Sequence, residues 1–212
     1  MNLKQFKKLP IIGILRGVSL DSIEPLVKTI ASSCLKTIEI TMNTPGAPGI
    51  IRRAIKASRG RLTVGAGTVL SKSDFKKATD SGASFIVTPT LLRDVVDLAL
   101  KKKLPVFPGA LTPQEIHDAW KAGATMVKVF PSKFFGPSYF KEIKGPFANI
   151  KLLACGGVTP INIKSFFECG ASGVAFGASI FKKEWIKRRH FYRISECIEE
   201  LISKSGLKKN NI

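Results

Sequence analysis

The chain has 212 residues, 44% of them hydrophobic and 23% charged, which is typical of one globular α/β domain over residues 1–212 and excludes a disordered chain. No apolar run is long enough to cross a membrane, and the N-terminus has no apolar signal core. We therefore expect a cytoplasmic protein with no membrane partner.

Eight apolar runs follow one another along the chain, and amphipathic stretches separate them. In these stretches apolar residues return at spacings of three and four, which predicts helices with one buried face. Eight strand–helix units in this length favour a (β/α)8 TIM barrel over a doubly wound sheet. A short helix at 2–8 should cover the bottom of the barrel, and a helix at 188–204 should pack outside it. The predicted strands cover residues 10–17, 35–43, 62–70, 84–91, 104–111, 125–131, 150–157 and 172–180.

The chain carries 34 lysines and arginines against 15 aspartates and glutamates, a formal net charge of +19. Such a charge is compatible with an anionic substrate or a nucleic acid. Most of the lysines are scattered at helix-like positions, and the densest basic cluster covers 182–193. Because basic charge alone specifies no partner, we interpret this charge as solvated helix faces and expect no nucleic-acid partner.

Two charged residues interrupt predicted strands. Lys128 stands in the run TMVKVFP, and Glu39 stands in TIEITMN. A strand buried on both faces is apolar at almost every position, and a buried charge is costly unless it is paired or neutralised. Burial lowers the pKa of a lysine, and a neutral amine is a nucleophile. The pair therefore indicates chemistry on a carbonyl through a Schiff base.

In a TIM barrel the functional residues lie at the C-terminal ends of the strands. Candidates there, besides Lys128 and Glu39, are Arg16 in the first strand, Asn43 in the second, Thr68 in the third and Phe130 in the sixth. A lone threonine is more often a satisfied polar residue of the core than a functional residue.

The last two strands end in glycine-rich turns. Gly156 and Gly157 in CGGVTP would let a phosphate approach backbone N–H groups and the start of the next helix, and Ser179 in FGAS offers a hydroxyl donor. Phosphate sites in this fold commonly use the loops after strands seven and eight. Glycines also serve tight turns, so a phosphate site stays one of two interpretations.

Metal and dinucleotide sites lack their usual residues. His117 and His190 are the two histidines, and both fall on predicted outer helices, which argues against a histidine-rich zinc site or a histidine triad. The segment GAGT at 65–68 does not match the dinucleotide pattern. The four cysteines form no CxxC pair, and we expect buried free thiols.

Seven segments together resemble a known family. They are PIIGILRG, IEITMNTP, VGAGTVL, IVTP, FPGALTPQE, VKVFPSKFFGPSYFK and ACGGVTP, in this order between residues 9 and 181. The ordered set resembles the class I aldolases that cleave 2-keto-3-deoxy-6-phosphogluconate (KDPG) and 4-hydroxy-2-oxoglutarate (KHG), including the branch that acts on the phosphogalactonate (KDPGal). The resemblance implies a homotrimeric (β/α)8 barrel that uses no metal and no cofactor.

The resemblance also implies roles for individual residues. Lys128 matches the Schiff-base lysine and Glu39 the general acid/base. Some members carry an arginine where this chain has Asn43, and the branch with ILRG shows the same exchange, so Arg16 is expected to bind the substrate carboxylate. The alternative is that Arg16 pairs with Glu39 and tunes its proton affinity. The pyruvate pocket would be lined by Thr68, Pro89 and Phe130, and the phosphate end by Gly156, Gly157 and Ser179.

Two other functions fit the same residues. Another small phosphate-binding barrel enzyme, such as a decarboxylase or an epimerase, would use Lys128 as an electrostatic group. A non-catalytic sugar-phosphate or nucleic-acid binder would keep the barrel and the basic surface. The sequence itself does not choose between KDPG, KDPGal and KHG as the substrate, which is expected to be a small keto acid.

Overall fold

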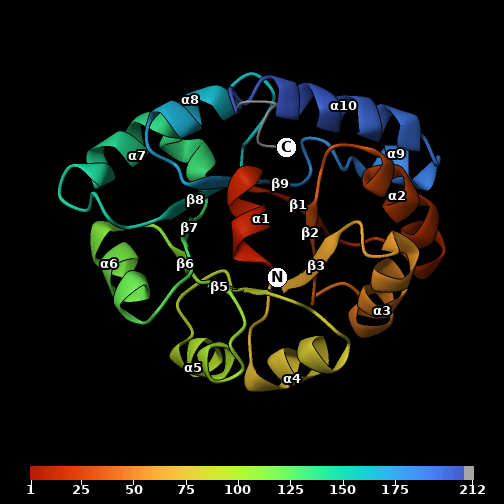
Figure 1. The fold of residues 1–212 in the computed structure, drawn as a ribbon, viewed down its shortest axis with the longest axis horizontal. Coiled ribbons are helices and arrows are strands. Elements are labelled where there is room, and N and C mark those ends of the chain that lie inside the picture. The colour runs from red at the N-terminus through yellow and green to blue at the C-terminus, as the bar shows by residue number, and fades with distance from the viewer. Residues whose placement is uncertain (208–212) are drawn as a thin grey trace.

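A computed structural model describes residues 1–207 and shows parallel strands that curl into a barrel inside a ring of helices (Figure 1). The order of the strands in the sheet is β5-β4-β3-β2-β1-β9-β8-β7-β6. This confirms the predicted barrel. The strands are β1 (Ile11–Leu15), β2 (Thr37–Thr41), β3 (Thr63–Gly67), β4 (Ile86–Val87), β5 (Val106–Phe107), β6 (Gly109–Ala110), β7 (Val127–Val129), β8 (Leu152–Cys155) and β9 (Gly173–Phe176).

The fifth predicted strand is divided in two at Pro108, which is why nine strands form from eight apolar runs. The part before Pro108 pairs with β4, and the part after it pairs with β7. Proline has no N–H to donate, but its carbonyl accepts a hydrogen bond from the Lys128 N–H at 2.8 Å. The chain therefore passes from one neighbouring strand to the other at this residue, and the ring of strands is nearly closed.

The helices alternate with the strands, as the sequence predicts, and surround the barrel (Figure 1). None of the helices within residues 1–207 is long and apolar enough to cross a membrane. The helices are α1 (Leu3–Lys8), α2 (Leu20–Ser32), α3 (Ala47–Ser58), α4 (Lys72–Asp80), α5 (Arg93–Lys101), α6 (Pro113–Lys121), the 3₁₀ helix η1 (Ser132–Phe134), α7 (Gly136–Lys144), α8 (Ile163–Glu168), α9 (Lys183–Lys187) and α10 (Phe191–Ser203).

The predicted helix at 188–204 begins later than expected. A separate short helix, α9, precedes it, and a turn in which Arg189 has a positive φ of 55° divides the two. His190 therefore lies ahead of α10 and not within a helix. The expected domain boundary at residue 212 lies outside the described residues.

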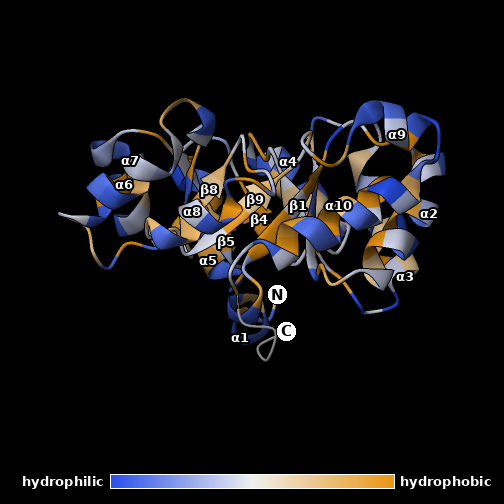
Figure 2. Ribbon diagram, turned by 90° about the horizontal axis from the view of Figure 1, so that it is seen from above, coloured by the Kyte–Doolittle hydropathy of each residue, from blue (hydrophilic) through white to orange (hydrophobic). Residues whose placement is uncertain are grey.

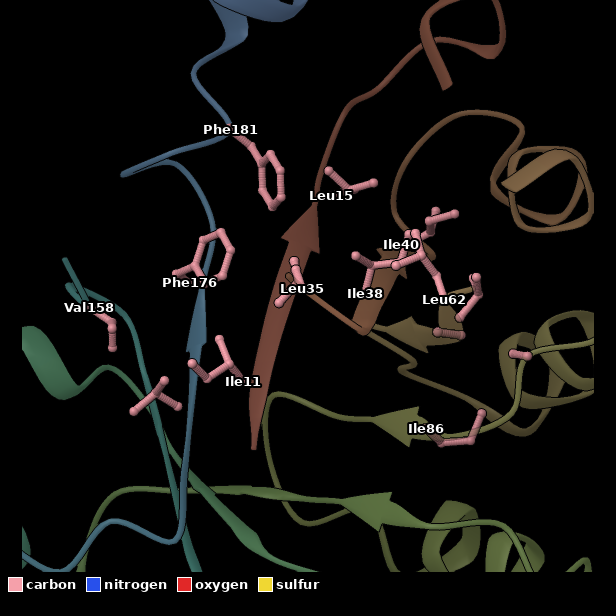
Figure 3. Close-up of a cluster of buried hydrophobic side chains, with 14 of the residues drawn as sticks. Ile11, Leu15, Leu35, Ile38, Ile40, Leu62, Ile86, Val158, Phe176 and Phe181 are labelled. Carbon is pink, nitrogen blue, oxygen red and sulfur yellow. The ribbon is translucent and has the colours of Figure 1, made fainter. Parts of the chain in front are cut away.

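Two apolar layers hold the barrel in shape. The outer layer lies between the strands and the surrounding helices, and Figure 3 shows part of it, including Ile38, Ile40 and Phe176. In Figure 2 the strands are mostly orange and the helices carry blue outer faces. Because β2 is buried at all five positions, side chains on both of its faces are held in place. This is the burial pattern expected of a parallel strand inside a barrel.

An aromatic floor fills the lower part of the barrel. The Phe107 ring packs edge-to-face on Phe6 at 5.9 Å and on Phe85 at 5.8 Å between ring centroids. Phe6 comes from α1, which lies beneath the barrel as predicted (Figure 2). Aromatic pairs in this geometry stabilise a core beyond the area they bury. The floor therefore leaves the opposite end, where the strands terminate, as the place for polar side chains.

Candidate active site

Lys128 is the central residue of β7 and points into the barrel. Its neighbours Val127 and Val129 belong to the outer apolar layer, so strand alternation turns Lys128 inward. Only 5% of the residue is exposed. Its ammonium lies 5.0 Å from the centroid of the Phe130 ring, and within residues 1–207 it forms no ion pair. An amine held this way is accessible to a ligand without first breaking a salt bridge.

Glu39 is the central residue of β2 and is 2% exposed. Its carboxyl group fills the space above Gly67, where an added Cβ would come within 2.1 Å of Oε1. Burial raises the pKa of the Glu39 carboxyl, and the positive charges of Lys128 and Arg16 partly oppose this shift. A carboxyl group with a raised pKa holds its proton more firmly than an exposed one, and such perturbed groups are typical of sites that transfer protons.

Arg16 and Thr68 meet at the ends of β1 and β3. An Nη of Arg16 donates a hydrogen bond to Thr68 Oγ1 at 3.3 Å. Thr68 has a φ of 52°, a left-handed conformation that is rare for a β-branched residue and costs about 1–3 kcal/mol. This turn breaks the alternation of the strand, so a residue that would otherwise point outward reaches Arg16. Within the described chain no ion pair joins Arg16 to Glu39, the pairing considered as the alternative from the sequence.

Cys155 is an inward-facing residue that the sequence reasoning did not place in the site. It ends β8, is 2% exposed and belongs to the cluster of side chains inside the barrel. Burial raises the pKa of its thiol to about 11, against the opposing charge of Lys128. The thiol is therefore neutral at pH 7. Strand alternation could have revealed it, because Cys155 lies two residues after Leu153 and therefore on the same inward face.

The expectation of buried thiols is correct only for Cys155. Cys34 is exposed, and Cys169 and Cys197 are half-buried. Each of these three lies in or beside a helix that surrounds the barrel, where one edge faces the solvent.

Pro89 and Phe130 line the rim of the barrel. Together with Gly109, Leu111 and Glu115 they border a cavity of about 340 Å³. Phe130 is 39% exposed, because one edge of its ring faces outward while Lys128 lies over the ring. The structure thus connects three of the predicted residues, Lys128, Phe130 and Pro89, along one side of the opening.

The glycine-rich ends of β8 and β9 lie against each other, as the sequence suggested. Ser179 Oγ donates to the Val158 carbonyl at 2.9 Å, which joins the two loops. Gly156 and Gly157 have positive φ values of 92° and 80°, and Gly156 borders Phe130. In this arrangement the Ser179 hydroxyl proton is already engaged, so it would have to rotate before donating to a ligand.

The next helix does not begin directly after the glycines, contrary to the expectation from CGGVTP. α8 begins at Ile163, because Asn162 holds a turn in front of it. Its Oδ1 accepts from the Thr159 N–H and its Nδ2 donates to the Gly157 carbonyl, both at 2.8 Å. Any anion at this end therefore meets the loop backbone and not a helix terminus.

Comparison with known proteins gives a consistent result. The family model described as "Aldolase: KDPG and KHG aldolase" matches residues 3–197. The 2-dehydro-3-deoxy-6-phosphogalactonate aldolase of Escherichia coli K12 is 34% identical over 82% of this chain and 86% of its own. A structure described as native KDPGal is 30% identical, with a TM-score of 0.86 over 93% of this chain and 94% of its own.

A further solved structure bears on the chemistry. The KDPG aldolase of Legionella pneumophila, with pyruvate captured as a covalent carbinolamine intermediate, is 25% identical, with a TM-score of 0.83. The match covers 93% of this chain and 96% of that one.

We expect Glu39→Gln to stabilise the fold by an amount that grows with pH. Since the pKa is raised on folding, the folded state holds a proton that the unfolded state has lost above about pH 4.3. The wild-type protein therefore loses stability as the pH rises from there to the raised value, and glutamine does not. Thermal unfolding of both proteins at about pH 4 to 8 measures this. A difference in Tm that shrinks with rising pH would contradict the raised pKa.

Proposed function

The chain belongs to the KDPG and KHG aldolase family, and on this premise we propose that it cleaves its substrate through a Schiff base on Lys128. The reaction is the reversible aldol cleavage of a 2-keto-3-deoxy-6-phosphoaldonate to pyruvate and glyceraldehyde 3-phosphate. The observation that carries the proposal is the burial of one amine, Lys128, in the same barrel interior as one carboxyl group, Glu39.

The first step joins the substrate to the protein. The deprotonated amine of Lys128 attacks the C2 ketone and gives a carbinolamine, which loses water to form an imine. The protonated imine attracts the electrons of the C3–C4 bond, which a ketone does far less well. The position of Lys128 above the aromatic floor supports this role, because the reacting carbonyl would be shielded from bulk water.

The second step moves protons through Glu39. Its carboxylate takes the proton of the C4 hydroxyl, the C3–C4 bond breaks, and its electrons form the enamine of pyruvate while the aldehyde departs. The same carboxyl group then returns a proton to C3, and water releases pyruvate from Lys128. The raised pKa of Glu39 supports this double use, because it moves the carboxyl group from its ordinary acidic range towards the working pH.

The remaining residues position the two ends of the substrate. The carboxylate of pyruvate would accept hydrogen bonds from Arg16 and Thr68, which already lie in contact. At the rim, Pro89 and Phe130 would pack against the carbon chain of the substrate around C3, which becomes the methyl group of pyruvate. Gly156, Gly157 and Ser179 would receive the phosphate. The similarity to the E. coli phosphogalactonate aldolase favours the phosphogalactonate as the substrate of this chain. Comparing kcat/KM for KDPGal, KDPG and KHG would test this choice.

Lys128→Met should abolish both turnover and the trapping of pyruvate, because methionine keeps the apolar stem but lacks the amine. Mass spectrometry after borohydride reduction with pyruvate should find a stable adduct at Lys128 in the wild-type protein. Lys151→Met, which removes an exposed lysine before β8, serves as the control and should trap normally. Glu39→Gln should still form adduct while its turnover falls by roughly 10²–10⁴. An adduct on a different lysine would exclude the assignment.

Arg16→Lys should raise the KM for pyruvate in the condensation direction by roughly severalfold, because lysine cannot form two parallel hydrogen bonds to a carboxylate. The pH–rate profile should hardly move. If Arg16 instead tunes Glu39, the acidic limb should shift while the KM for pyruvate stays constant, and carboxylate binding would be the wrong role.

We also propose a homotrimer in the cytoplasm, on the resemblance to the family. Light scattering should give three times the 23.1 kDa mass of the chain at micromolar concentration. A mass of one chain would refute the trimer, and the proposed chemistry would be unaffected.

A further inference from the structure

We propose that Lys133 is a specificity-determining residue that binds the phosphoryl group of the substrate. Lys133 lies in η1, the turn directly after β7, so it follows the strand that carries Lys128. It lies within the segment VKVFPSKFFGPSYFK, but the resemblance implies no role for it. The inference rests on the proposed function. It supplies a cationic side chain for the phosphoryl group, which the glycine-rich loops themselves do not contain.

The backbone of Lys133 packs directly on the glycine turn. A Cβ added to Gly157 would come within 2.5 Å of the Lys133 Cβ and 3.1 Å of its Cα. Only glycine at position 157 allows this approach. The stem of Lys133 therefore starts beside the turn, and its ammonium can reach a ligand that lies over the two glycines.

Within the part of the chain that the structure describes, the turn at Gly156 and Gly157 has backbone N–H groups that donate no backbone hydrogen bond. Among the backbone hydrogen bonds found in residues 1–207, none is donated by the N–H of Gly156 or Gly157. Consecutive free N–H groups in a turn form a concavity that binds anions. On the other side, the contact between Ser179 and Val158 brings the loop after β9 to the same place.

The ammonium of Lys133 is available to an anion. It lies 4.7 Å from the centroid of the Phe134 ring, and none of the ion pairs within the described residues includes it. Lys133 is exposed, and Phe134 is 71% exposed. A cation that rests on an exposed ring can exchange this weak contact for a phosphoryl oxygen.

The base of Lys133 is held rigidly relative to Lys128. Ser132 Oγ donates to the Val129 carbonyl at 2.7 Å and accepts from the Cys155 N–H at 3.1 Å. These two bonds tie the end of β7 to the end of β8. The backbone position from which Lys133 extends is thereby held relative to the strand of Lys128, which suits a substrate with an anion at its far end.

The test compares Lys133→Met with Lys141→Met, which removes the same charge from an exposed position in the following helix α7. Each protein is assayed with a 2-keto-3-deoxy-6-phosphoaldonate and with the same acid lacking the phosphate. Lys133→Met should raise the KM for the phosphorylated acid roughly tenfold, with kcat nearly unchanged, because a charge-assisted contact is lost. The KM for the unphosphorylated acid should stay the same, and Lys133→Arg should recover most of the loss.

Two results would overturn the inference: equal effects on both acids, or equal effects of Lys133→Met and Lys141→Met. Borohydride trapping of pyruvate keeps this outcome separate from the proposed function, since pyruvate has no phosphate. Wild-type protein that traps no pyruvate would refute the Schiff base. Normal trapping with no phosphate-dependent change in Lys133→Met would refute the role of Lys133 alone.

Discussion

The alternation of side chains along strands in a closed ring controls the rest of this structure. Every second residue of each strand must point into the same narrow space, so each inward position decides what that space contains. Here the lower positions are aromatic, and Phe6, Phe85 and Phe107 fill them. The upper positions carry Lys128 and Glu39, two groups that an apolar interior would normally exclude.

Packing outside the barrel makes this arrangement possible. Residues such as Ile38 and Ile40 anchor the strand of Glu39 against the surrounding helices, and Val127 and Val129 do the same for the strand of Lys128. Because both faces of these strands are packed, the amine and the carboxyl group keep their positions although they lie far apart in the sequence. The outer layer supplies the apolar burial that offsets the cost of two charges inside.

The sequence predicted the barrel and its two inward charges, because a lysine or a glutamate inside an apolar run is conspicuous against the period of a strand. It did not predict the division of a strand at Pro108, which depends on the different neighbours on either side. The left-handed turn at Thr68 is not visible in the composition, and Cys155 could be assigned to the barrel interior only from strand alternation, because a cysteine resembles an apolar strand residue. The sequence could not single out Lys133 among the other lysines, because its contact with Gly157 exists only in the folded chain.

The aromatic floor has a consequence for the order of events. Because the aromatic rings close the lower end of the barrel, ligands enter and leave through the upper end, and the ligand that binds last leaves first. Pyruvate attached to Lys128 would lie between the aromatic floor and the aldehyde. Under the proposed chemistry the aldehyde would depart before pyruvate, and in the reverse direction pyruvate would bind before the aldehyde. This order would follow from two features together: the Phe6, Phe85 and Phe107 rings packed beneath the site, and the proposed covalent bond between pyruvate and Lys128.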